Sequence, residues 1–158
     1  MAREIKFRGK TLNGDWVKGA YFAMRHDDER KHTHHFIIPD GTPIPKDRPI
    51  GNIQVEVREF TVGQFTGLLD IHGKEIYEGD IVQRVYRMEE GRGKNKHEVL
   101  RPVGNCKPKV ISFRMGAFGY VNFKEREYVE EEWLPLLDEE CEVLGNIFDN
   151  PEIECGGD

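Results

Sequence analysis

Apolar and polar residues alternate along most of this chain, which is the period of a β-strand with one buried face. The alternation is clearest in NIQVEVREF, where Ile53, Val55 and Val57 are expected to face the core. The opening segment EIKFRG repeats the pattern, with Ile5 and Phe7 on one face and basic residues on the other. Both segments therefore predict half-buried strands.

Turn residues divide the rest of the chain into short strands. Asn13-Gly14 suits a two-residue hairpin turn, and Pro39-Asp40-Gly41 ends a strand that begins in HHFII. Gly116 and Ala117 are predicted to join the strands KVISFRM and FGYVNF, and DIVQRVYRM and CEVLGNIF complete the set. The best helix candidate is KEREYVEEEWL, which Pro135 would end. The pattern as a whole predicts a mainly β protein.

The composition limits the cellular compartments and the classes of partner that fit this chain. The 158 residues suffice for one domain or two small ones, and the net charge of −6 argues against a nucleic-acid binder that is basic throughout. No stretch has the apolar length of a signal-peptide core or a membrane span. Cys106, Cys141 and Cys155 are odd in number and lack metal-ligand spacing, which is typical of reduced thiols. We expect a cytoplasmic protein with no membrane partner and no cofactor.

The segment GQFTGLLDIHGKEIYEGDIV gathers acidic residues, a histidine and glycines, and it has two interpretations. As turn chemistry, Asp70 bonds the backbone of a turn at His72-Gly73, and Glu78-Gly79-Asp80 forms a second turn before a strand. As a catalytic loop, it would need two carboxylates at a defined separation, or His72 poised as a base. The spacing requires neither arrangement, so we predict turn chemistry and assign no catalytic residue.

The histidine-rich segment MRHDDERKHTHH has the residue types of a metal site. His32 and His34 would share one face of an extended segment, and a nearby aspartate could complete the ligand set. A solvated loop is the alternative, because metal sites require rigid support around their ligands. We expect the solvated loop and name His32, His34 and His35 as the ligand candidates if a metal binds.

The segment RMEEGRGKNKHEVLRPVGNCKPK, residues 87–109, is rich in Gly, Lys and Arg and predicts a long basic loop. Such a loop can follow a phosphate backbone, although it offers few aromatic partners for bases, and a solvated loop is the alternative. The candidate contact residues, in this loop and just before it, are Arg84, Arg87, Arg92, Lys94 and Lys96.

An acidic counterpart follows in residues 125–142, which hold nine acidic side chains. Opposite charges on one chain favour docking of copies, either head to tail or symmetrically. The alternative is a charged face that keeps the protein soluble. The charge pattern leaves a homo-oligomer and a solvated acidic face as open alternatives.

Three segments resemble one known family: IKFRGKTLNGDWVKG near the start, VGQFTGLLDIHGKEIYEGDIV in the middle and EVLGNIFDNPEI near the end. In this order they are similar to the YopX family of small proteins encoded in bacterial phages and prophages. The resemblance covers most of the chain. It implies a mainly β fold whose second half resembles a small SH3-like barrel beginning around EGDIV, together with self-association. It implies no biochemical role, because the family has none assigned.

These observations predict an N-terminal β region over Met1–Phe65 and an SH3-like β-barrel region over residues 66–154. The leading hypothesis is a phage or prophage accessory protein that works by binding itself, a host protein or nucleic acid, and not by catalysis. The rival is a nucleic-acid hydrolase, because some small ribonucleases with SH3-like barrels also begin a strand with GDIV. A nuclease should lose activity when Asp80 or His72 is replaced, whereas a binder should respond to reversal of the basic charges.

Overall fold

A computed structural model describes residues 4–25, 32–43, 46, 53–104, 106–114, 116–124, 127–135 and 140–155, with the backbone alone in 122–124 and 127–135. The chain divides into two compact units. Unit 1 is Met1–Gly67 and unit 2 is Leu68–Asp158.

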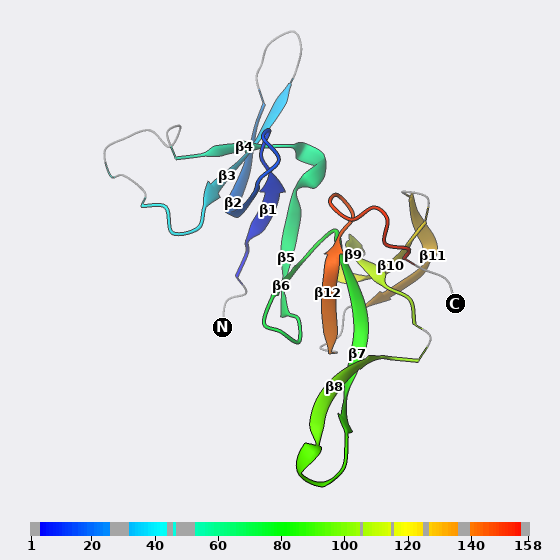
Figure 1. The fold of residues 1–158 in the computed structure, drawn as a ribbon. Helices are drawn as coiled ribbons and strands as arrows, with labels where there is room; N and C mark the ends of the chain where they lie inside the picture. The colour runs from blue at the N-terminus through cyan, green and yellow to red at the C-terminus, as the bar shows by residue number, and fades with distance from the viewer. Residues whose placement is uncertain are drawn as a thin grey trace. The chain divides into compact units, whose positions relative to one another are not determined.

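Strands make up nearly all of the regular structure, and the predicted mainly β class is confirmed (Figure 1). In unit 1 they are β1 (Phe7–Lys10), β2 (Trp16–Arg25), β3 (Thr33–Pro39), β4 (Val55–Val57) and most of β5 (Gly63–Leu69). Unit 2 holds β6 (Glu75–Tyr77), β7 (Asp80–Glu90), β8 (His97–Pro102), β9 (Lys109–Arg114), β10 (Ala117–Lys124), β11 (Glu127–Pro135) and β12 (Cys141–Asn146). Two 3₁₀ turns, η2 (Glu59–Thr61) and η3 (Gly93–Asn95), are the helical segments of the described chain. No described helix is long and apolar enough to span a membrane.

The predicted helix over KEREYVEEEWL is wrong. Residues Glu127–Pro135 form strand β11, which pairs antiparallel with β10. The Tyr, Val and Trp residues of this segment favour strands. The ladder with β10 also supplies backbone hydrogen bonds that a short acidic helix would have to form without support. A neighbouring strand therefore overrides the local helix propensity.

Unit 1 is an antiparallel sheet with the strand order β4-β3-β2-β1-β5. β1 and β2 form the predicted hairpin, in which Thr11 N–H donates to Asp15 O at 2.8 Å and Gly14 takes a positive φ of 97°. The connecting loop has three residues, 12–14, where two were predicted. The predicted turn after β3 is present, with Thr42 N–H donating to Pro39 O at 3.2 Å.

Alternation along these strands sorts the side chains of unit 1 onto two faces. One face carries Ile37 and Val57, which are 0% and 3% exposed. The other face carries the cross-strand pairs Lys10–Trp16 and Phe22–Phe36, whose side chains are half-buried. The first face is therefore a core, whereas the second retains contact with solvent.

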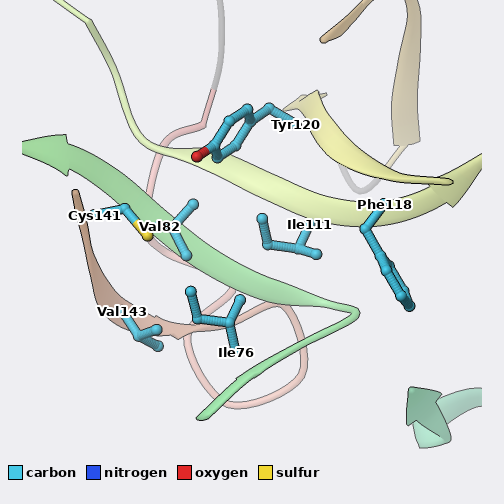
Figure 2. Packing of buried hydrophobic residues seen from close by; sticks show 7 residues of the cluster. All are labelled: Ile76, Val82, Ile111, Phe118, Tyr120, Cys141 and Val143. Carbon is cyan, nitrogen blue, oxygen red and sulfur yellow. The ribbon is translucent and has the colours of Figure 1, made fainter. Parts of the chain in front are cut away.

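Unit 2 is built on a sheet with the strand order β11-β10-β9-β7-β12, and both faces of this sheet are buried. Consecutive residues of one strand, such as Ile81 and Val82 on β7, point to opposite faces. One face holds the cluster shown in Figure 2: Ile76, Val82, Ile111, Phe118, Tyr120, Cys141 and Val143. The other face holds a smaller cluster of Ile81, Val110, Val121 and Cys155. This explains why DIVQRV carries apolar residues at successive positions.

The described strands of unit 2 do not close into the predicted SH3-like barrel. β11 and β12 are the two ends of the strand path, and no described pairing joins them. The first half of β7 lies between β9 and β12, and its second half pairs with β8. Unit 2 is thus an open sheet with one long central strand.

Strands replace the predicted basic loop in residues 87–90 and 97–102. β7 continues to Glu90 and β8 returns from His97, with registered pairs from Val85–Pro102 to Glu90–His97. Gly91 and Gly93, with φ of 102° and 60°, turn the chain at the tip. We call Val85–Pro102 the β7–β8 hairpin, and Figure 1 shows it extending beyond the rest of the sheet of unit 2.

Candidate functional site

The acidic segment around Asp70 is a turn, as predicted. Asp70 is 7% exposed, and its carboxylate accepts the backbone N–H groups of His72 and Lys74 at 2.8 Å and of Val143 at 3.1 Å. Burial raises the pKa of the Asp70 carboxyl, but these backbone donors outweigh it and hold the pKa below its usual value. An ionised carboxylate engaged in this way fastens the turn to β12 and is not suited to donate a proton.

Asp80 and His72, the residues named for the hydrolase hypothesis, have separate partners in unit 2. Asp80 is 1% exposed, and its carboxylate accepts Tyr77 N–H at 2.8 Å. His72 is exposed, and its Nε2 lies 3.2 Å from Glu142 Oε1. The Asp80 contact closes the second predicted turn, Glu78-Gly79-Asp80, whose last residue is the first residue of β7.

The structure separates the candidate metal ligands. His34 and His35 are neighbours on β3, so their side chains lie on opposite faces of the sheet. His34 Nδ1 lies 2.7 Å from Glu56 Oε1, His35 Nδ1 lies 2.7 Å from the Tyr21 hydroxyl, and His32 precedes the strand and is exposed. Within the described part of the chain, no three possible ligands gather at one point. His26, Asp27 and Asp28 lie outside the described residues.

Strand pairing also assembles a polar array that the sequence did not indicate. The Tyr21 ring stacks on the His35 ring at 5.9 Å, and His35 Nε2 lies 3.6 Å from Glu59 Oε2. Burial, and then the charge of Glu59, raises the pKa of Tyr21. A raised pKa keeps the phenol protonated, so Tyr21 is better placed to join β2 to β3 than to act as a nucleophile.

Part of the predicted basic surface is neutralised by neighbouring acids. Arg87 donates to Glu98 at 2.9 Å and to Glu140 at 3.0 Å, and Arg101 donates to Glu90 across the hairpin. The hydrogen bond with Glu140, followed by that with Glu98, raises the pKa of Arg87, and the hydrogen bond with Arg101 lowers the pKa of Glu90. Solvent screens such exposed pairs, so their main effect is to cancel charge.

The other predicted contact residues occupy three kinds of position. Arg84 is half-buried on β7. Lys96 Nζ lies 3.0 Å from Glu89 Oε2. Arg92 and Lys94 are exposed at the tip, where neither forms an ion pair with another described residue. The uncompensated positive charge of the hairpin is therefore concentrated at its tip.

Apolar side chains lie on one face of the hairpin. Tyr86 and Met88 are 44% and 42% exposed, and Val99, the registered partner of Met88, is half-buried. An isolated two-stranded ribbon is marginally stable and gains stability when another surface packs on its apolar face. Exposed apolar side chains that gather in this way mark contact surfaces more often than isolated ones do.

Three strands of unit 2 have a free edge in the described sheet, and one of them, β12, pairs with β7 alone. β8 pairs with β7 alone, and β11 pairs with β10 alone. The register between β10 and β11 shifts from Tyr120–Leu134 to Asn122–Val129, and the acidic run 130–132 lies within this shift. A basic hairpin and an acidic irregular edge therefore stand on different strands of one sheet.

Comparisons with known proteins give a family. Residues 6–153 match a family model described as YopX protein. The comparison with curated proteins found no match. Among solved structures, protein EF1440 from Enterococcus faecalis is similar, with 22% identity over 96% of this chain and 98% of that chain and a TM-score of 0.44.

Proposed function

The chain belongs to the YopX family, and from that premise we propose that it acts by binding a protein partner through the β7–β8 hairpin. The opposite charges on the chain favour a second copy of the chain as this partner. In this arrangement the basic tip of one hairpin docks on the acidic run 130–132 of another copy.

The observation that carries the proposal is the open edge of the projecting hairpin. β8 has one described neighbour, β7, so the backbone groups along its outer edge are available for another strand. Tyr86 and Met88 add exposed apolar area beside that edge. Natural edge strands are usually shielded, and an edge that is long and flanked by apolar side chains favours association.

The distribution of charge favours a protein over nucleic acid as the partner of this hairpin. Affinity for nucleic acid grows with the number of phosphates that the protein neutralises. Arg87, Lys96 and Arg101 already contact acids of this chain, which leaves Arg92 and Lys94 at the tip. Two cations supply little phosphate binding, but they suffice to steer docking onto an acidic protein edge.

We propose the bacterial cytoplasm as the location of this interaction. The free state of Cys106, Cys141 and Cys155 supports it, because a reducing compartment keeps thiols unpaired. A phage or prophage origin, which the sequence resemblance implies, stays a prediction.

The test is size-exclusion chromatography with light scattering at low and high salt. We expect a mass above that of the monomer at low salt, falling as salt screens the charges. Lys94→Glu should shift the protein to monomer. Lys74→Glu makes the same charge change at an exposed position of unit 2 outside the hairpin and should leave the mass unchanged.

A charge exchange identifies the two surfaces. An Arg92→Glu and Lys94→Glu variant should be monomeric alone, and so should a Glu130→Lys and Glu132→Lys variant. Mixing the two should restore association, because each reversed hairpin then meets a reversed edge. A wild-type protein that stays monomeric at low salt contradicts the proposal. So does a hairpin variant that keeps its mass and instead loses binding to duplex DNA.

A further inference from the structure

A second surface, on the sheet of unit 1, combines aromatic and basic side chains. Strand register places them on one face, because residues opposite each other in an antiparallel pair point the same way. The pairs are Arg8–Lys18 and Lys10–Trp16 between β1 and β2, and Phe22–Phe36 between β2 and β3. We call these six residues the aromatic face.

At one end of this face, rings form a row. The Phe22 and Phe36 rings stack with centroids 5.4 Å apart and an interplanar angle of 25°. The His34 ring continues the row, 6.2 Å from Phe36 at 17°, and Glu56 holds it through a 2.7 Å contact. The two Phe side chains are half-buried, so the row is both fixed in place and in contact with solvent. Stacked rings of this kind extend readily to one more flat group.

At the other end, cations gather around Trp16. The Arg8 guanidinium lies 4.7 Å from the centroid of the Trp16 ring, and Lys10 Nζ lies 5.7 Å from it. Arg8 is 8% exposed, so it supports the Trp16 ring from within the sheet, whereas Lys10 is half-buried. Lys18 is exposed beside them. Such cation–π contacts hold an aromatic ring and basic groups together in one place.

The charge of the aromatic face contrasts with that of the whole chain. Its six residues include Arg8, Lys10 and Lys18 and no acid, whereas the net charge of the protein is −6. The nearest registered acid is Glu56, opposite Phe36 on β4, at the end of the face that lacks these cations. The basic side chains are thus segregated on one part of an acidic molecule.

We propose that the aromatic face binds single-stranded nucleic acid. Rings on a sheet stack bases without regard to sequence, while neighbouring cations track the phosphates. Trp16 and Phe22 are six residues apart on β2, a span of about 20 Å at ~3.3 Å per residue, which accommodates several nucleotides. A duplex keeps its bases stacked inside, so the rings favour a single strand. This site goes beyond the proposed function, which concerns a protein partner and unit 2.

The test is the fluorescence anisotropy of a labelled oligothymidylate of about 16 nucleotides titrated with the full chain. With Lys10 and Lys18 engaged, log Kd should change with log salt at a slope of about 1.4, and base stacking supplies the rest of the affinity. Replacing both rings, Phe22→Leu with Phe36→Leu, should weaken binding about tenfold or more, because leucine retains apolar volume but cannot stack on a base. Phe60→Leu makes the same change at a ring that is 70% exposed on η2 and should have no effect.

A substitution at an exposed lysine tests the site without depending on whether the double ring variant folds. Lys18→Ala should weaken binding and reduce the salt slope by about 0.7. Lys74→Ala, at an exposed lysine of unit 2, is its control and should change neither. Because Lys18 is exposed, its removal tests the site even if the double ring variant fails to fold.

Several outcomes would overturn the inference. The first is that the protein does not bind the oligonucleotide at low salt. The second is that it binds duplex and single strand with equal affinity. The third is that the ring variant folds and keeps the wild-type affinity for the oligonucleotide. Loss of binding in the Arg92→Glu and Lys94→Glu variant alone would move the site to the hairpin. A ring variant that alters the mass of the protein but not its oligonucleotide affinity would make the aromatic face a protein contact. Because the mass and the oligonucleotide affinity are measured separately, this inference and the proposed function can fail independently.

Discussion

At the scale of single residues, Asp70 shows how a carboxylate in an apparent active-site loop serves the fold. Its two oxygens accept three backbone N–H groups, and one of these, from Val143, lies on a distant strand. Asp70→Ala leaves those donors without an acceptor and should lower the free energy of unfolding by about 3 kcal/mol. Asp70→Asn keeps one acceptor oxygen and should cost less. Urea unfolding monitored by circular dichroism measures both values.

The pH dependence of stability follows from the lowered pKa of Asp70. A carboxyl whose pKa is lower in the folded state stabilises fully above its unfolded pKa of about 4, and this contribution disappears as the pH falls through the folded value. The wild type should therefore lose more stability on acidification than Asp70→Ala does. The same substitution at exposed Asp15 is the control for loss of a surface carboxylate. Equal acid sensitivity of wild type and Asp70→Ala would contradict this account.

At the scale of elements, the local sequence pattern predicted a strand or a turn where the residues that define it are neighbours in sequence. Of the strand predicted from the alternation of Ile53, Val55 and Val57, the segment Val55–Val57 forms β4 and Ile53 lies in a turn before it. Turn residues such as Gly14 and Gly41 likewise depend on neighbours in sequence. The β7–β8 hairpin was missed because its polar composition resembles that of a loop. Its strands are joined by the backbone ladder from Val85–Pro102 to Glu90–His97, a pairing of distant residues that the polar composition does not reveal.

The aromatic face could not be predicted from the sequence, for the same reason. Phe22 and Phe36 stand on different strands, and the β2–β3 register alone makes them neighbours. Trp16 likewise meets Lys10 only through the β1–β2 register. The basic residues that are close together in sequence lie in residues 87–109, whereas those of the unit 1 sheet meet their aromatic neighbours only in the fold.

The tip of the β7–β8 hairpin provides a prediction at this scale. Gly91 has φ of 102°, and a Cβ there would clash with the backbone oxygen of Asn95, so Gly91→Ala must distort the tip. Gly93→Ala is the matched control, because Gly93 has φ of 60° and no atom lies within 4 Å of the added Cβ. Its cost should be about 1–2 kcal/mol, and that of Gly91→Ala clearly larger.

Hydrogen exchange of the β8 amides reports this difference directly. Gly91→Ala should speed exchange in His97–Pro102 and weaken self-association, whereas Gly93→Ala should have a smaller effect on both. Equal exchange in the two variants would show that the tip tolerates the clash.

At the scale of the whole molecule, the reactivity of the cysteines shows whether the two faces of the unit 2 sheet open together. Cys141 belongs to one buried cluster and Cys155 to the other, at 2% and 5% exposed, whereas Cys106 is half-buried. Burial raises the pKa of the Cys155 thiol from 9.0 to about 11, which suppresses the reactive thiolate. We therefore expect a thiol reagent near neutral pH to modify one cysteine quickly and two slowly.

The two slow thiols should react at the same rate, because both clusters rest on the same strands β7, β9 and β10 and neither face can open without the other. Cys106→Ala should remove the fast phase and leave the slow one, and mass spectrometry of the labelled peptides assigns each phase. Above the unfolded thiol pKa of 9.0, stability should fall with rising pH until about 11, since unfolding then releases the Cys155 proton. Cys155 labelling well ahead of Cys141 would show instead that the smaller cluster opens alone, and that unit 2 is not a single cooperative structure.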